Sequence, residues 1–130
     1  MIVYSPMASG LLTGSFAAGG LDHLAPDDWR RRATAFQEPA FSRALALVER
    51  LRPVAARLGV TLPALAVAWA LALPGVTGAI VGARRPCQVS DWLAAGDLRL
   101  AGEDIAEIER AVAETGAGTT EPTPPPPVRR

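Results

Sequence analysis

Two adjacent arginines, Arg84 and Arg85, are the side chains in this sequence best suited to binding an anionic ligand. They follow a short apolar run that ends at Gly82, and Pro86 then opens a predicted helix. The first turn of a helix has free backbone N–H groups, which attract anions together with the helix dipole. Guanidinium groups add fixed charge and a fork geometry that fits phosphate. The stretch is therefore a candidate phosphate site, although arginines at a helix start are also common on a solvated surface.

The composition limits the classes of function. The 130 residues suit one domain, and 49% of them are hydrophobic, so the chain can form a core. Thirteen basic and thirteen acidic residues give a formal net charge of zero, whereas a nucleic-acid binder normally has a basic excess. The longest apolar run, 62–74, is shorter than the roughly 20 residues that cross a bilayer. We therefore expect no nucleic-acid or membrane partner, and the single cysteine, Cys87, fits a reducing, cytoplasmic location.

Two short strands are predicted on either side of a helical region. Residues 2–4 are strand-like by propensity, and Pro6 ends that strand because proline cannot donate to a ladder. The second strand covers 78–82, directly before the arginines. Glycine-containing pairs predict turns and a flexible loop over 7–24, and the segment 27–29 is suited to opening a short helix.

Helices are predicted from apolar residues at spacings of three and four in four segments, 41–58, 62–73, 86–95 and 102–114. Gly59 is placed to end the first of them, and Thr61 to cap the second. Pro53 lies inside the first helix and is expected to kink it or split it in two, because it removes a backbone donor. The second helix is apolar on nearly all sides, so we expect it to be buried.

Three segments taken together resemble the aldo/keto reductase family. Residues 4–14, Tyr-Ser-Pro-Met-Ala-Ser-Gly-Leu-Leu-Thr-Gly, are similar to the segment that starts at the family's seventh strand. Residues 60–69 resemble the helix before its last strand, and residues 80–89 resemble its eighth strand and the 2′-phosphate loop after it. Order and spacing agree over residues 1–114. We therefore divide the chain into a partial reductase barrel, 1–114, and a disordered proline-rich tail, 115–130.

The resemblance implies a barrel of eight parallel strands, each followed by a helix, which needs about 250 residues. This chain is about half that length and offers two strands. We therefore expect the α/β class, as the C-terminal fragment of a (β/α)8 TIM barrel that is mostly helical with two short parallel strands. The missing N-terminal half of the barrel would then be a partner of this chain.

The resemblance also implies a reaction, the NADPH-dependent reduction of aldehydes and ketones. It places the catalytic aspartate, tyrosine, lysine and histidine on the earlier strands, where the tyrosine protonates the developing alkoxide. The sequence has no lysine, and its one histidine, His23, stands in a loop where a surface histidine is expected. We therefore predict no catalytic residue and no metal site in this chain, and no activity of the chain alone.

The resemblance does assign residues to the cofactor, NADP. Tyr4 matches the position whose ring stacks on the nicotinamide, and a core aromatic is the alternative. The resemblance assigns four residues to the pyrophosphate and three to the 2′-phosphate: Ser5, Met7, Ser9 and Gly10, then Gly82, Ala83 and Arg84. Gln88 matches a position that presents Arg or Gln to this phosphate or to the adenine. Asp91 and Trp92 match a pair that is commonly Glu and Asn, so the indole of Trp92 either stacks on the adenine or packs in the core.

A second hypothesis comes from a different class of function. Strands without their barrel neighbours would leave unpaired edges and an apolar face, which suits a non-catalytic helical module that binds another protein. A non-functional truncated product is a further alternative. Measurable binding of NADPH would favour the oxidoreductase hypothesis, and a folded chain that does not bind NADPH would favour the interaction module.

Overall fold

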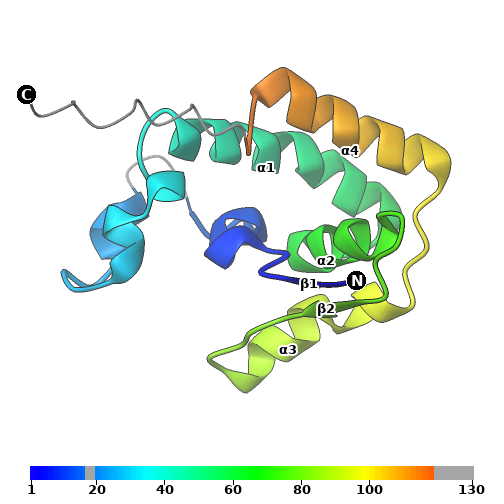
Figure 1. The fold of residues 1–130 in the computed structure, drawn as a ribbon, viewed down its shortest axis with the longest axis horizontal. Helices are drawn as coiled ribbons and strands as arrows, with labels where there is room; N and C mark the ends of the chain where they lie inside the picture. The colour runs from blue at the N-terminus through cyan, green and yellow to red at the C-terminus, as the bar shows by residue number, and fades with distance from the viewer. Residues whose placement is uncertain (17–19, 119–130) are drawn as a thin grey trace, which may run out of the picture.

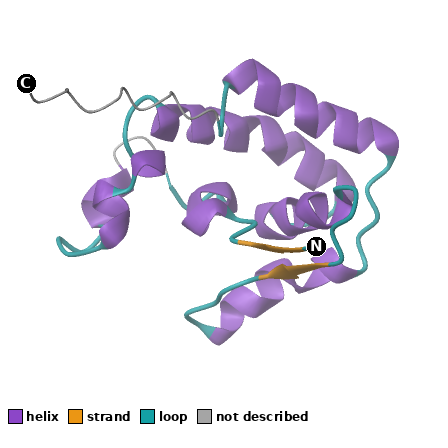
Figure 2. Cartoon of the chain, viewed as in Figure 1, coloured by secondary structure: helices purple, strands orange, loops and turns teal. Residues whose placement is uncertain are grey.

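Two parallel strands lie beside the helices that cover one face of them (Figures 1 and 2). The structure is a computed structural model, and it describes residues 1–16 and 20–118. Strand β1 (Ile2–Tyr4) pairs in parallel with β2 (Gly78–Ile80), so that Ile2 lies opposite Gly78 and Tyr4 opposite Ile80. Paired residues of the two strands are 76 positions apart in sequence, so the predicted pair forms across α1 (Ala40–Leu58) and α2 (Leu62–Ala72), which lie between them.

The second strand is shorter than predicted. It ends at Ile80, whereas the sequence predicted that it would continue to Gly82. The reason lies in β1, because Ser5 adopts a left-handed backbone with φ 51° and Pro6 follows. A left-handed residue leaves the extended conformation, so β1 offers only three residues and the ladder stops with it.

The segment after β1 forms short 3-10 helices rather than an open loop. These are η1 (Ala8–Thr13) and η2 (Gly20–His23), and residues 17–19 between them lie outside the described ranges. The predicted turns are present, since Gly10 and Gly14 have φ of 98° and 80°. Left-handed angles of this size favour glycine, which lacks a Cβ.

Helix α1 (Ala40–Leu58) is continuous through Pro53, so of the two outcomes expected for this proline, a kink or a split, the split does not occur. Residues on both sides of the proline, Leu51 and Val54, are 5% and 0% exposed and pack in the same core cluster. Burial of one apolar stripe along the whole helix therefore outweighs the lost hydrogen bond at the proline. The helix ends as predicted at Gly59, which has a left-handed φ of 67°.

Helix α2 (Leu62–Ala72) begins with the predicted cap. The hydroxyl oxygen of Thr61 accepts a hydrogen bond from the backbone N–H of Ala64 at 3.1 Å. All seven residues from 62 to 68 are buried, as its continuous apolar sequence predicted. On one side α2 packs against β2 and the residues that follow it, since Ala79 and Val81 belong to the same cluster as Val67.

The chain ends with α3 (Pro86–Leu93), the short η5 (Ala94–Gly96) and α4 (Gly102–Thr115), which packs along α1 (Figure 1). Arg57 of α1 donates hydrogen bonds to Asp104 and Glu107 of α4, both at 2.8 Å. The Arg57 hydrogen bond holds the pKa of the buried Asp104 carboxyl below its usual value. Beneath these ion pairs Ile108 is 1% exposed, so α4 closes the main core.

A second cluster holds the 20–36 segment against the start of α1. It contains six buried apolar residues, Leu11, Phe16, Leu24, Phe36, Phe41 and Ala44. Two further 3-10 helices, η3 (Trp29–Arg32) and η4 (Thr34–Phe36), run over it. The short helix expected near 27–29 is confirmed as η3, and the carboxylate of Asp28 caps it by accepting from the Arg30 N–H at 3.0 Å.

The face of the sheet away from the helices is exposed. Ile2, Tyr4 and Ile80 point to that side and are 66%, 81% and 65% exposed. Within 1–16 and 20–118, each strand pairs only with the other. The strands therefore offer unpaired backbone edges and an apolar face, as the sequence analysis anticipated.

Helix α4 ends one residue later than predicted, and the division of the chain at 114/115 stays a prediction. Thr115 belongs to α4, and Ala117 is 8% exposed within the main core cluster. The predicted disordered tail falls mainly on 119–130, which lie outside the described residues, so it stays a prediction.

In the part of the chain that the structure describes, no single helix is long and apolar enough to cross a membrane. Only α1 and α2 taken together, bent by 90°, pass the same test of length and composition.

Candidate functional site

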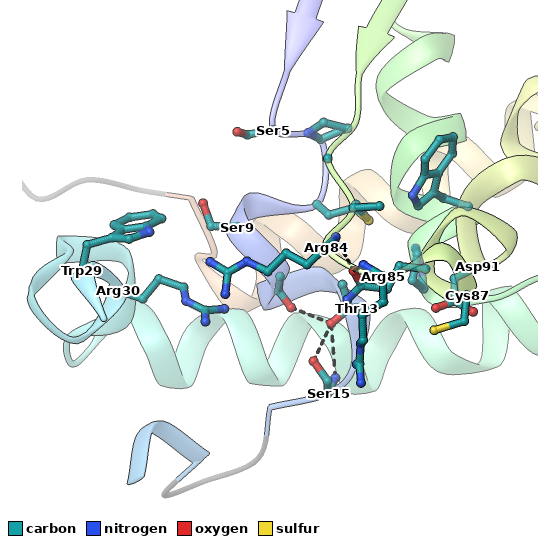
Figure 3. Close-up of a pocket in the computed structure, with 18 residues that line it drawn as sticks. Ser5, Ser9, Thr13, Ser15, Trp29, Arg30, Arg84, Arg85, Cys87 and Asp91 are labelled. Carbon is teal, nitrogen blue, oxygen red and sulfur yellow. Dashed lines mark hydrogen bonds between the residues drawn. The ribbon is translucent and has the colours of Figure 1, made fainter. Parts of the chain in front are cut away.

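A cleft of about 850 Å³ opens at the carboxyl ends of the two strands. One wall is the stretch after β1, and a second is the β2–α3 connection with the first turns of α3. A third segment, η3, contributes Trp29 and Arg30 (Figure 3). Because β1 and β2 are parallel, the loops that leave them meet at the same edge of the sheet, where open α/β sheets commonly bind ligands.

The cleft brings together ten of the eleven residues that the sequence analysis assigned to a cofactor. They are Ser5, Met7, Ser9, Gly10, Gly82, Ala83, Arg84, Gln88, Asp91 and Trp92. Tyr4 is the exception, because its side chain is 81% exposed on the open face of the sheet and does not line the cleft. Its stacking on a nicotinamide ring stays a prediction.

The wall after β1 has an unusual backbone. Ser5, Ala8 and Ser9 have φ of 51°, 49° and 56°, although none of them is glycine. Left-handed non-glycine residues are uncommon and cluster at functional sites. The N–H groups of Ala8 and Gly10 donate to carbonyls within the loop, at 2.9 and 3.1 Å. What this wall presents to a ligand is therefore mainly the exposed serines Ser5 and Ser9.

Gln88 holds the backbone of the second wall, the β2–α3 connection, through hydrogen bonds of its side chain. Its side-chain oxygen accepts hydrogen bonds from the backbone N–H groups of Arg84 at 2.7 Å and Arg85 at 3.1 Å. The N–H of Gln88 in turn donates to the carbonyl of Arg85 at 3.1 Å, and Pro86 has no N–H. Most of the backbone donors that the sequence analysis offered to an anion are thus already used. The attraction for an anion at this corner comes chiefly from the guanidinium groups.

The two arginines of this corner point in different directions. Figure 3 shows the Arg84 side chain reaching across the cleft toward Ser9 and Arg30, while that of Arg85 turns away from them. Cys87, the exposed free cysteine, borders the same cleft in the first turn of α3. Arg84 is therefore the better placed of the two to hold a ligand in the middle of the cleft.

Arg30, on the opposite wall, is a site residue that the sequence analysis missed. Its Nε and Nη2 donate to the carboxylate of Asp28 at 3.0 and 2.6 Å, and its Cζ lies 5.9 Å from the centre of the Phe16 ring. The Arg30 hydrogen bonds, with a smaller contribution from Arg84, hold the pKa of the Asp28 carboxyl well below its usual range. The same ion pair raises the pKa of Arg30.

Little in the sequence distinguishes which arginine in the run 30–32 faces the cleft. Arg31 donates to the carbonyls of Leu24 and Ala25 and so organises its own loop, and Arg32 is exposed. Three consecutive arginines look like a solvated charge run, and only the packing of the loop distinguishes them. The spacing Asp-x-Arg at 28 and 30 was the one available local signal.

The far end of the cleft holds Asp91 and Trp92. Trp92 packs against the cluster of Ala64, Val67 and Ala68, and its indole nitrogen is buried without a hydrogen-bond partner among the described residues. This supports the reading in which Trp92 packs in the core. Because Trp92 also lines the cleft, stacking on an adenine stays a prediction. Asp91 is exposed, and its carbonyl accepts from the Thr61 hydroxyl.

The charged side chains that line the cleft are mostly cationic. They are three arginines and one carboxylate: Arg30, Arg84, Arg85 and Asp91. At Gly82 an added Cβ would meet no atom within 4 Å, so the space beside this backbone is open to a ligand. No tyrosine, lysine or histidine lines the cleft, and within 1–16 and 20–118 no cluster of His, Cys, Asp and Glu could hold a metal ion. The guanidinium groups of the lining are suited to an anionic ligand.

Comparison with known proteins gives one consistent result. The profile described as the aldo/keto reductase family matches residues 1–113. A probable voltage-gated potassium channel subunit beta of Arabidopsis thaliana is 35% identical over 102 residues, 75% of this chain and 30% of that protein. An NADH-specific methylglyoxal reductase of Escherichia coli is 34% identical over 112 residues, 86% of this chain and 33% of the other.

Comparison with solved structures agrees with the sequence comparison. A solved structure of the glycerol dehydrogenase of Gluconobacter oxydans matches with a TM-score of 0.79 and 30% identity, over 94% of this chain and 36% of that one. The chain therefore spans about a third of the length of these relatives, and it has the fold of part of a TIM barrel, as expected. On the profile match and on the identity with its relatives, the chain belongs to the aldo/keto reductase family.

Proposed function

We propose that the cleft binds a nicotinamide dinucleotide, and that it prefers NADP to NAD. The observation that carries this is the meeting of the two predicted segments, 5–10 and 82–92, on one cleft with an excess of arginine. Family membership supports a nicotinamide cofactor in general. The choice between the two cofactors rests on Arg84, since one relative is named as NADH-specific.

Each group of the dinucleotide has residues suited to it. The Arg84 guanidinium binds the 2′-phosphate, with Gly82 and Ala83 leaving room beside it. The hydroxyls of Ser5 and Ser9 lie along the pyrophosphate. Gln88 acts by fixing the backbone of the Arg84 corner, and its side-chain oxygen is already committed to that corner. A charge-assisted hydrogen bond of this kind contributes about 1.5–3 kcal/mol, or about a tenfold or greater preference for NADP.

Five further residues complete the set proposed to bind the dinucleotide: Met7, Gly10, Asp91, Trp92 and Tyr4. The first two line the pyrophosphate path, and Asp91 and Trp92 lie at the adenine end of the cleft. Tyr4 stands at the end of β1, where its exposed ring is available to the nicotinamide.

The reaction of the whole protein is proposed to be the reduction of an aldehyde or ketone. The bound dinucleotide supplies the hydride, and this chain's residues bind and orient it. Proton donation needs a tyrosine made more acidic by a lysine, and this sequence has no lysine. We therefore propose that the chain alone binds the cofactor without turnover. The catalytic groups are proposed to come from the strands that, in the relatives, precede the part matched by this chain.

Titration of the 130-residue chain with NADP and with NAD tests the proposal. Replacing Arg84 by Ala should raise the Kd for NADP about tenfold or more and change the Kd for NAD little, because NAD has no 2′-phosphate. The matched control is Arg110→Ala, which removes the same charge from an exposed position on α4. Equal NADP affinity in Arg84→Ala and wild type would contradict the assignment, and oxidation of NADPH by the chain with a generic aldehyde would contradict its inactivity.

A second candidate function is favoured by the open face of the sheet. Ile2, Tyr4 and Ile80 are exposed there, and the outer edges of β1 and β2 are unpaired among the described residues. Such a surface suits a non-catalytic module that binds a protein. A chain that unfolds cooperatively in urea and yet binds neither NADP nor NAD would favour this function over the first.

A further inference from the structure

One face of the strand pair is apolar and exposed. Ile2, Tyr4 and Ile80 point to this side and are 66%, 81% and 65% exposed, whereas α2 packs against the other side. We propose that further copies of this chain cover the open face, with four copies closing one barrel of eight parallel strands. The inference names the occupant of the surface that the second candidate function uses, and it does not depend on cofactor binding.

The strand pair has an open edge on each side. Within 1–16 and 20–118, β1 and β2 pair only with each other, so each keeps a row of unpaired backbone N–H and C=O groups. Proteins that stay monomeric usually protect such edges with lysine, proline or an inward-pointing charge. The residues of the two strands, Ile-Val-Tyr and Gly-Ala-Ile, include none of these. The edges are therefore suited to pairing with a further strand.

The two open edges are complementary to each other. Because β1 and β2 are parallel, the β1 edge of one copy can lie beside the β2 edge of the next and continue the sheet in the same direction. Contacts between two different edges run head to tail, and they close into a ring when the rotation between copies allows it. Charge does not oppose the contact, because the chain has a formal net charge of zero and the exposed side chains of the face are apolar.

The number of copies follows from the fold. The chain has the fold of part of a TIM barrel, so its strand pair follows the wall of such a barrel. Eight strands give a barrel whose interior is just filled by side chains. The β1 and β2 strands of four copies supply this number. In that ring Ile2 and Ile80 of every copy point inward, and together they form an apolar interior.

Helix α3 supplies a second contact between copies. Val89 and Leu93 lie one turn apart on α3 and are 37% and 64% exposed, so the helix has an uncovered apolar stripe. The same helix packs in one cluster with β2, through Trp92 and Ala79. A strand added beside β2 therefore brings the helices of its own copy next to α3. The cleft stays open in the ring, because it lies at the carboxyl ends of the strands and not along their edges.

Analytical ultracentrifugation of the 130-residue chain, over a range of concentrations and without cofactor, tests the inference. The variants are Ile80→Glu and Ile2→Glu, which place charges on the open face. Both sites are exposed in the single chain, so the fold should persist, and circular dichroism checks this. The matched control is Leu73→Glu, which makes a similar change at a 39% exposed position at the end of α2, outside the open face.

The expected result is a discrete species of four times the monomer mass for the wild type and for Leu73→Glu. Ile80→Glu and Ile2→Glu should each sediment as monomers at concentrations that assemble the wild type. The reason is that the ring would bury four like charges together, without partners.

Four results would overturn the inference. A wild-type monomer would leave the open face to a different polypeptide. An assembly that stops at two copies would indicate contact between two faces rather than head-to-tail edges. A mass that keeps rising with concentration would show edges that pair without closing. Assembly that persists in both Glu variants would place the contact elsewhere. A monomer that binds NADP would refute this inference alone, and a four-copy species that binds no dinucleotide would refute only the cofactor proposal.

Discussion

Replacing Gln88 by Glu should stabilise the fold and weaken NADP binding at the same time. Gln88 lies in the first turn of α3. Its side-chain oxygen accepts hydrogen bonds from the backbone N–H groups of Arg84 and Arg85, at 2.7 and 3.1 Å. A carboxylate accepts the same two bonds, and they become charge-assisted. The same charge stands beside the arginine corner where we propose that the 2′-phosphate binds.

The two effects differ in sign and can be sized separately. A negative charge in the first turn of a helix contributes about 0.3–1 kcal/mol, which raises the Tm of a chain of this size by about 2–5 °C. Two unit charges about 8 Å apart in water repel by about 0.5 kcal/mol. A phosphate ester carries between one and two charges, so the loss in NADP affinity is about 0.5–1 kcal/mol, or about two- to fivefold. NAD lacks this phosphate, so the ratio of the two affinities should fall.

A thermal melt and a pair of titrations measure both quantities on one sample. The control is Ser90→Glu, which adds the same charge to an exposed position of α3 that does not line the cleft. A lower Tm for Gln88→Glu would mean that the side-chain oxygen does not hold the Arg84 and Arg85 backbone. An unchanged ratio of NADP to NAD affinity would refute the placement of the 2′-phosphate at this corner.

Two further predictions concern the fold. Leu65→Ala removes a side chain that is 1% exposed and should destabilise the chain by about 2–5 kcal/mol, measured as a lower urea midpoint. The control is Leu73→Ala, at a site 39% exposed, which should lower the free energy of unfolding by less than about 1 kcal/mol. Asp104→Asn should lower the Tm at pH 7, and the gap to wild type should close below about pH 4. The Arg57 hydrogen bond lowers the folded-state pKa of Asp104, so its contribution is present above the unfolded pKa and is lost on acidification. A gap that stays constant from pH 7 to pH 3 would contradict this.

Local signals predicted the helices well. Gly59 and Thr61 end one helix and begin the next through their own backbone and side-chain preferences, which act within a few residues. The sequence could not decide between a kink and a split at Pro53, because a continuous helix there depends on burial along both halves of α1, and burial is a property of the whole core. The end of β2 was misjudged for a similar reason, since a strand can pair only as far as its partner at 2–4 extends.

The site was predictable where it lies on the two strand ends and not where it lies on the 20–36 segment. Residues 5–10 and 82–92 carry a local pattern, and the parallel pairing of β1 with β2 brings them together. Arg30 reaches the cleft only because the aromatic cluster around Phe16 and Phe36 folds its segment back over α1. Side chains that meet through such packing leave no regular spacing in the sequence. The exposure of Tyr4 could not be predicted locally either, because it depends on the helices covering only the other face of the sheet.

The position of Cys87 has a practical consequence. It is the single cysteine of the chain, it is exposed, and it stands on the rim of the cleft. A maleimide dye will therefore attach at one defined point, with no need to remove other thiols or to introduce a new one. An environment-sensitive fluorophore at that point would report occupancy of the cleft through its emission, and protection of the thiol from alkylation would report the same event by mass spectrometry.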